Sequence, residues 1–143
     1  MELYRAIEAD IKALLDSDRN EALLITGARQ VGKTFIIRKC AKECFENVIE
    51  INFIEKPDAV KLFENARSSE DILLRISAFT DIPLIPGKTL IIFDEVQECK
   101  EIVTAIKFLV EDGKYRYILS GSLLGVELKD VRSVPVGYMT VLE

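Results

Sequence analysis

Apolar residues follow two different patterns along the chain. Short runs that are apolar almost throughout are typical of strands buried on both faces of a parallel sheet, and strands are expected at residues 22–26, 47–53, 89–95, 115–122 and 136–143. Between these runs, apolar residues recur every three or four positions, which is typical of one buried helix face. This spacing predicts helices at residues 3–14 and 33–44 and one from 102 to near 113, and local signals predict two more at residues 57–67 and 70–79.

Local signals support several of these helix boundaries. Pro57 is tolerated in a first helical turn, because its missing N–H group would have no partner there. Ser68 and Ser69, followed by Glu70 and Asp71, are typical of a capped helix start. Gly113 marks the end of the helix that begins near residue 102.

Strands that alternate with helices predict right-handed βαβ units and a parallel sheet covered on both faces. At 143 residues, the chain has room for one domain. The expected class is therefore α/β, with a single domain over residues 1–143. The order of the strands in space does not follow from periodicity.

Charge and composition narrow the function. Lys and Arg total 19 and Asp and Glu total 24, so the formal net charge is −5. An acidic chain gives no support for broad binding to nucleic acid or to a membrane surface. No apolar run reaches the roughly 20 residues of a membrane span, and the amphipathic N-terminus does not resemble a signal peptide. We therefore expect a cytoplasmic protein.

Histidine and cysteine usage excludes further classes. The chain has no histidine, which excludes Ser-His and Cys-His catalytic pairs and argues against a zinc site. The cysteines are odd in number and form no CxxC pattern. Cys40 and Cys44 are expected to share a helix face and to be reduced, partly buried packing residues.

The stretch GARQVGKT carries the strongest chemical signal. It follows the 22–26 strand directly and matches G-x-x-x-x-G-K-[ST] at Gly27, Gly32, Lys33 and Thr34. The glycines allow backbone N–H groups to come close to a phosphate, and the N-terminus of the following helix favours an anion. The Lys33 ammonium can reach the outer phosphates, and the Thr34 hydroxyl can ligate Mg²⁺. The expected nucleotide-binding residues are Gly27, Ala28, Arg29, Gln30, Val31, Gly32, Lys33 and Thr34. For Arg29, a phosphate contact and a solvent-facing position both stay open.

Two acids end the strand at residues 89–95. In open α/β sheets ligands bind at the carboxyl ends of the strands. Asp94 can hold Mg²⁺ there, and Glu95 can deprotonate an attacking water. The alternative is that the acids only end the strand and cap the next helix. Gln97 either senses the nucleotide state or is an ordinary residue at a helix start.

The strand at 115–122 reaches the same edge of the sheet. Ser120 is its first polar residue near that end. Its hydroxyl can contact the terminal phosphate or the attacking water. The alternative is a serine that bonds only within its own turn.

Taken together, GARQVGKT, FDEVQ and SGSLLGV resemble a prokaryotic family of AAA+ ATP-binding proteins along nearly the whole chain. The resemblance implies a three-layer P-loop NTPase core with a mostly parallel five-stranded sheet, and it places the phosphate-loop strand in the middle. It also implies ATP and Mg²⁺ as cofactors, with Lys33 and Thr34 at the phosphates and the metal. Asp94 would be the Walker B acid, Glu95 the catalytic glutamate and Ser120 the first sensor. Tyr4 and Arg5 would lie near the adenine, unless they only form a solvated helix face.

The chain departs from this pattern in two respects. The helical lid of AAA+ proteins and the family's usual C-terminal nuclease-like domain are missing, so we expect the chain to be the front part of a longer protein and a weak or inactive ATPase by itself. Arg132 is the candidate arginine finger, which would imply a homo-oligomer, or it is a solvated loop residue. Position 138, often basic in the family, is Tyr138. The alternative function is a nucleotide-gated switch with little intrinsic hydrolysis.

Overall fold

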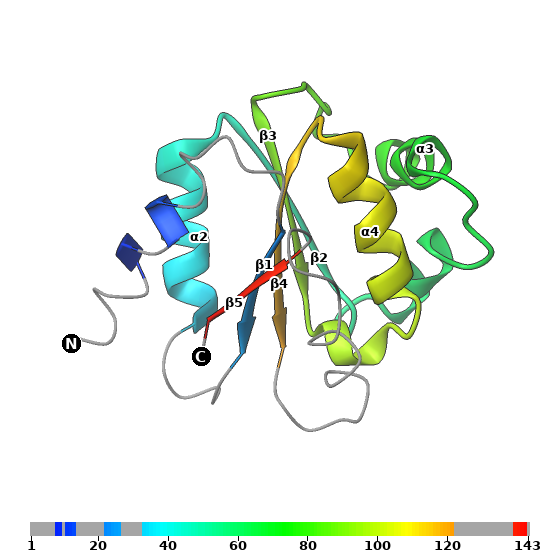
Figure 1. Cartoon of the computed structure of the whole chain (residues 1–143), viewed down its shortest axis with the longest axis horizontal. Helices are drawn as coiled ribbons and strands as arrows, with labels where there is room; N and C mark the ends of the chain where they lie inside the picture. Colours follow the sequence, from blue (N-terminus) through cyan, green and yellow to red (C-terminus); the bar gives the residue numbers. More distant parts are fainter. Residues whose placement is uncertain (1–7, 10, 14–21, 27–32, 122–138, 143) are drawn as a thin grey trace.

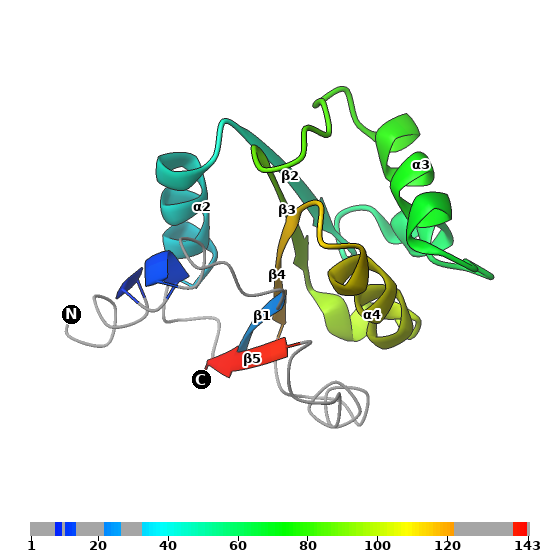
Figure 2. The same cartoon turned by 45° about the horizontal axis from the view of Figure 1, so that its top comes forward.

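The computed structural model describes residues 8–9, 11–13, 22–26, 33–121 and 139–142. Its centre is a parallel five-stranded sheet in the order β2-β3-β4-β1-β5, seen from two directions in Figures 1 and 2. The strands are β1 (Ala22–Thr26), β2 (Asn47–Asn52), β3 (Thr89–Asp94), β4 (Arg116–Gly121) and β5 (Met139–Leu142). The expected α/β class and parallel sheet are confirmed. The expectation that the phosphate-loop strand is central is wrong, because β4 is the middle strand and β1 lies between β4 and β5.

Helices cover both faces of the sheet and complete three layers (Figure 1). Helix α2 (Lys33–Cys44) lies on one face, and α3 (Ser69–Phe79) and α4 (Ile102–Asp112) lie on the other. Helical residues at positions 8–9 and 11–13 join the α2 layer, where Ile11 is fully buried.

The alternation of strand side chains divides the core into two clusters. On β3, Leu90 and Ile92 belong to the α2 cluster, whereas Ile91 and Phe93 belong to the α3–α4 cluster. Successive residues of a strand point to opposite faces, and apolar residues at both sets of positions bury the sheet on both sides. The continuous apolar runs of the sequence have this origin.

Most expected helices and strands are present, and some of their ends differ from the predicted ones by a residue. Ser68 caps α3, because its Oγ accepts a hydrogen bond from the Asp71 N–H at 3.2 Å. Gly113 ends α4 with a φ of 72°, in the left-handed region that glycine adopts at low cost. Strand β2 ends at Asn52 rather than 53, and β3 ends at Asp94 rather than 95.

The prediction of a helix at residues 57–67 is wrong. The chain forms the 3₁₀-helix η2 (Pro57–Leu62), followed by a turn. Phe63 is buried against Phe53 and Phe93, with ring centroids 5.8 and 5.5 Å apart, and Asn65 has a φ of 55°. A left-handed residue cannot continue a right-handed helix, so packing of Phe63 and the turn at Asn65 end the element early.

The expected packing role of the cysteines holds for the described side chains. Cys40 and Cys99 are buried and Cys44 is half-buried. Burial raises the pKa of the Cys40 thiol to about 11 and that of the Cys99 thiol to about 12. Neutral thiols packed among apolar groups behave as small hydrophobic side chains.

Candidate functional site

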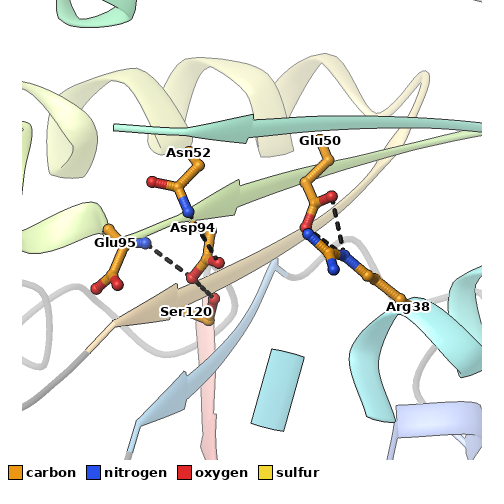
Figure 3. Close-up of polar contacts among 6 residues, drawn as sticks. All are labelled: Arg38, Glu50, Asn52, Asp94, Glu95 and Ser120. Carbon is orange, nitrogen blue, oxygen red and sulfur yellow. Dashed lines mark hydrogen bonds and ion pairs between the residues drawn. The ribbon is translucent and has the colours of Figure 1, made fainter. Parts of the chain in front are cut away.

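Three polar residues form a row across the carboxyl ends of neighbouring strands. Asn52 of β2 pairs in register with Asp94 of β3, and Asp94 pairs with Ser120 of β4. By strand alternation all three lie on the α2 face of the sheet, since Val48, Ile92 and Ile118 belong to the α2 cluster. Figure 3 shows the three side chains in this row.

Asp94 is the centre of the row. Its side chain is buried, and the residue keeps 5% of its surface exposed. Oδ1 accepts hydrogen bonds from Ser120 Oγ at 2.5 Å and from the Glu95 backbone N–H at 2.9 Å. Oδ2 accepts a longer one from Asn52 Nδ2 at 3.4 Å. A buried carboxylate needs such donors, and the shorter contacts leave Oδ2 as the less occupied oxygen.

Ser120 therefore does not bond only within its own turn. It is 1% exposed, and its hydroxyl reaches across to the neighbouring strand. Sequence reasoning identified Ser120 and Asp94 separately, and the structure brings them together.

Asn52 is a site residue that the sequence interpretation missed. Besides its contact with Asp94, its Oδ1 accepts hydrogen bonds from the backbone N–H groups of Ile54 and Glu55 at 2.9 and 3.0 Å. Asparagine commonly stabilises a turn in this way. A polar residue at the carboxyl end of an otherwise apolar strand was the available signal.

Glu95 lies in a left-handed turn, with φ 58° and ψ 48°. This conformation is uncommon for a residue with a long side chain, and the Asp94 carboxylate supports it by accepting the Glu95 N–H. The turn takes Glu95 out of the strand and leads into the 3₁₀-helix η3 (Val96–Glu98). The Glu95 side chain makes no cap hydrogen bond to that helix, so the capping alternative finds no support in η3.

Gln97 contacts Glu95 directly. Its Nε2 donates a hydrogen bond to Glu95 Oε1 at 2.9 Å. Sequence reasoning left Gln97 between a sensing role and an ordinary helix-start position. The structure places its side chain against the Glu95 carboxylate.

The start of α2 is described from Lys33 onward. Lys33 is the first residue of α2, its side chain lies outside the described part, and Thr34 is half-buried in the first turn. The expected strand before and helix after the GARQVGKT stretch are both present. Several residues named in the sequence analysis lie outside the described residues: Tyr4, Arg5, Gly27, Ala28, Arg29, Gln30, Val31, Gly32, Arg132 and Tyr138.

An ion pair fixes α2 to the sheet near this row. Arg38 Nε donates to both carboxylate oxygens of Glu50, at 2.9 and 3.1 Å. The hydrogen bond to Glu50, the charge of Glu50 and the charge of Asp94 together raise the pKa of the Arg38 guanidinium. Figure 3 shows this pair further along the same face.

The arrangement combines hard oxygen donors with a helix start. Asp94 supplies a carboxylate, and Thr34 and Ser120 supply hydroxyl groups. Mg²⁺ prefers such ligands together with phosphate oxygens, and the N-terminus of α2 favours an anion. The residues present therefore fit a magnesium–phosphate ligand.

The fold and this edge of the sheet define an AAA+ P-loop NTPase core. The chain belongs to the AAA domain family, whose sequence profile matches residues 19–143. The resemblance seen in the sequence is thereby confirmed at the level of the family.

Solved structures agree on the fold. The chain is similar to PCH-2 of C. elegans, at 13% identity and a TM-score of 0.59, over 100% of this chain and 43% of that one. It is also similar to a chain of Drosophila ORC bound to DNA, at 12% identity and a TM-score of 0.53, over 99% of this chain and 89% of that one. At these identities the likeness concerns the fold alone, and the chain spans less than half the length of PCH-2.

No curated protein sequence matches the chain. Among the described residues, no helix combines the length and apolar character that crossing a membrane requires.

Proposed function

We propose that the chain binds ATP and ADP with Mg²⁺ at the carboxyl edge of the sheet and hydrolyses ATP as part of a conformational cycle. The observation that carries this proposal is the buried Asp94, held by Ser120 and by the Glu95 N–H group at the edge where β1 leads to α2 through GARQVGKT. A rigid acid beside a phosphate-loop sequence is suited to a metal-bound nucleotide.

The roles divide among a few residues. Residues 27–32, Lys33 and the start of α2 would hold the phosphates. Thr34 and Asp94 would hold Mg²⁺, with Asp94 acting through water from Oδ2. The bound Mg²⁺ would offset negative charge on the phosphates. Asn52 and Ser120 keep the Asp94 carboxylate in one orientation.

Glu95 is the proposed general base. In this role its carboxylate would accept a proton from the attacking water. Ser120 would sense the terminal phosphate. A phosphate bound at this edge would compete with Asp94 for the hydrogen bond that the Ser120 hydroxyl donates.

A second function, a nucleotide-gated switch with little intrinsic hydrolysis, is favoured by one observation. Glu95 lies outside β3 in a left-handed turn, so the position of its carboxylate depends on contacts beyond the strand. In this alternative, a partner or a second copy of the chain would complete the site.

Replacement of Lys33 tests nucleotide binding. Loss of a charge-assisted contact costs about 1.5–3 kcal/mol, so Lys33→Ala should weaken binding of a fluorescent ATP analogue about tenfold or more. The matched control is Lys42→Ala, an exposed lysine in the last turn of the same helix, which should bind as the wild type does. An affinity of Lys33→Ala within about twofold of the wild type would reject the proposal.

A further inference from the structure

The Gln97 side chain lies between Glu95 and the end of β4. Its Nε2 donates to Glu95 Oε1 at 2.9 Å. Its Oε1 is buried and has no hydrogen-bond partner among the described residues. That oxygen occupies the space that a Cβ atom on residue 121 would need.

The orientation of the amide follows from chemistry. An ionised carboxylate only accepts hydrogen bonds, so the amide nitrogen must face Glu95. The amide oxygen then necessarily faces Gly121. Burying an amide oxygen without a donor is unfavourable, and the hydrogen bond from Nε2 to Glu95 offsets part of this cost.

Gly121 leaves room for the end of the Gln97 side chain. Among the described glycines, Gly87 and Gly113 have a positive φ and Gly121 does not. A Cβ atom at this position would collide with Gln97 Oε1 and approach Val96 Cγ2 and the Val96 backbone N at 3.3 Å. The η3 turn therefore packs directly on the backbone of the last residue of β4.

We propose that Gln97 is a positioning residue that orients the Glu95 carboxylate and couples it to the end of β4. This inference rests on the proposed function, because it assigns a control element to the same site. Ser120, which bonds Asp94, directly precedes Gly121. A displacement of Ser120 is passed through one peptide unit to Gly121, and from there through Gln97 to Glu95.

Asp94 and Gln97 support different parts of Glu95. Asp94 fixes its backbone through the N–H group, and Gln97 fixes its carboxylate. Loss of Gln97 should therefore disturb the carboxylate alone. Metal and phosphate binding, which depend on residues 27–34 and on Asp94, should continue.

A double-mutant cycle tests this role. Gln97→Leu, Glu95→Gln and the double variant are compared in single-turnover hydrolysis of Mg-ATP with excess protein, together with nucleotide affinity. Gln97→Leu should lower the hydrolysis rate tenfold or more while affinity stays within about twofold. In the Glu95→Gln background the same change should have less than a twofold effect. If Gln97→Leu does not fold, Gln97→Met keeps the length of the side chain and removes the donor without adding a charge.

A second measurement does not depend on turnover. Gln30 and Gln97 are the only glutamines in the sequence, so ¹⁵N-glutamine labelling gives two side-chain amide signals, and Gln97→Leu assigns them. The Gln97 signal should shift in Glu95→Ala and in Gly121→Ala. It should not shift in Glu98→Ala, which removes an exposed acid from the same turn.

The outcomes separate the two proposals. If the wild type binds nucleotide but hydrolyses none, the enzyme proposal fails, and the amide signals still decide the role of Gln97. If Glu95→Gln abolishes hydrolysis while Gln97→Leu is unchanged or faster, the inference is overturned and the enzyme proposal stands. A Gln97 signal that is identical in wild type and Glu95→Ala also overturns it.

Discussion

At the scale of single residues, two adjacent acids have different surroundings. Asp94 is buried and accepts hydrogen bonds from three donors. Glu95 is half-buried and lies in a left-handed turn outside the strand. The position of Asp94 could be predicted from the apolar run that ends with it. The turn at Glu95 could not, because it depends on a hydrogen bond to the preceding side chain.

Replacing Asp94 and Glu95 by the corresponding amides should separate metal binding from proton transfer. Glu95→Gln keeps an oxygen for Gln97 but removes the proton acceptor, so Mg-ATP affinity should hold while single-turnover hydrolysis falls about 10²–10⁴-fold. Asp94→Asn removes the charge that would hold Mg²⁺ and places an amide group near Asn52 Nδ2, now 3.4 Å from Asp94 Oδ2. Its nucleotide affinity should lose its Mg²⁺ dependence.

The two variants are measured side by side, by nucleotide titration with and without Mg²⁺ and by hydrolysis of bound ATP. Normal hydrolysis by Glu95→Gln would remove Glu95 from the mechanism and leave the switch ahead of the enzyme. Unchanged Mg²⁺-dependent affinity in Asp94→Asn would argue against the metal role of Asp94.

At the scale of elements, the α3 region shows where local patterns were sufficient and where they failed. The start of α3 followed from a serine cap and two acids, and the structure confirms it. Pro57 predicted a helix over residues 57–67, whereas this segment buries Ala59 and Phe63 and forms the shorter 3₁₀-helix η2. Such packing against distant strands cannot be inferred from periodicity.

Arg75 of α3 stabilises the turn that replaces the expected helix. Its Nη1 donates to the carbonyl oxygens of Leu62 and Glu64 at 3.2 and 2.8 Å, and its Nη2 donates to Asp71 Oδ2 at 3.0 Å. Carbonyl groups at the end of a helical segment need such donors.

Removal of this arginine should destabilise the protein. Arg75→Ala is expected to lower the free energy of unfolding by about 1–2 kcal/mol, since it removes charge-assisted bonds to carbonyl groups. The measurement is urea unfolding followed by circular dichroism. Arg67→Ala removes an exposed arginine in the connection before α3, so it controls for the loss of charge. Equal effects of the two substitutions on the free energy of unfolding would contradict a stabilising role of Arg75 at this turn.

At the scale of the molecule, one sheet separates two cores with different neighbours. The larger cluster packs β1, β2, β3 and β4 against α3 and α4. The smaller one packs β1, β3 and β4 against α2, the helix whose first turn contains Lys33 and Thr34. The layers and the parallel strands were predictable from continuous apolar runs. The order of the strands was not, because every run of this kind is compatible with several positions in a sheet.

Two adjacent isoleucines of β3 offer a matched test of this division. Ile91 is fully buried in the α3–α4 cluster, and Ile92 is 2% exposed in the α2 cluster, together with Ile36 and Ile37 of α2. Truncation of a buried isoleucine to alanine typically costs 2–5 kcal/mol. Both Ile91→Ala and Ile92→Ala should therefore lower the urea midpoint by similar amounts.

Their effects on nucleotide affinity should differ. Ile92 faces the layer that positions the start of α2, on the same face as Asp94 and Ser120, so Ile92→Ala should loosen that helix and weaken Mg-ATP binding severalfold. Ile91→Ala leaves this layer intact and should bind nucleotide nearly as the wild type does, under conditions where both variants are fully folded. Stabilisation by saturating ATP should accordingly be smaller for Ile92→Ala, because a bound ligand adds stability in proportion to the logarithm of its concentration over Kd. Equal affinities in the two variants would show that α2 is positioned independently of the core beneath it, and the site would then depend on residues 27–34 and on the row at the strand ends alone.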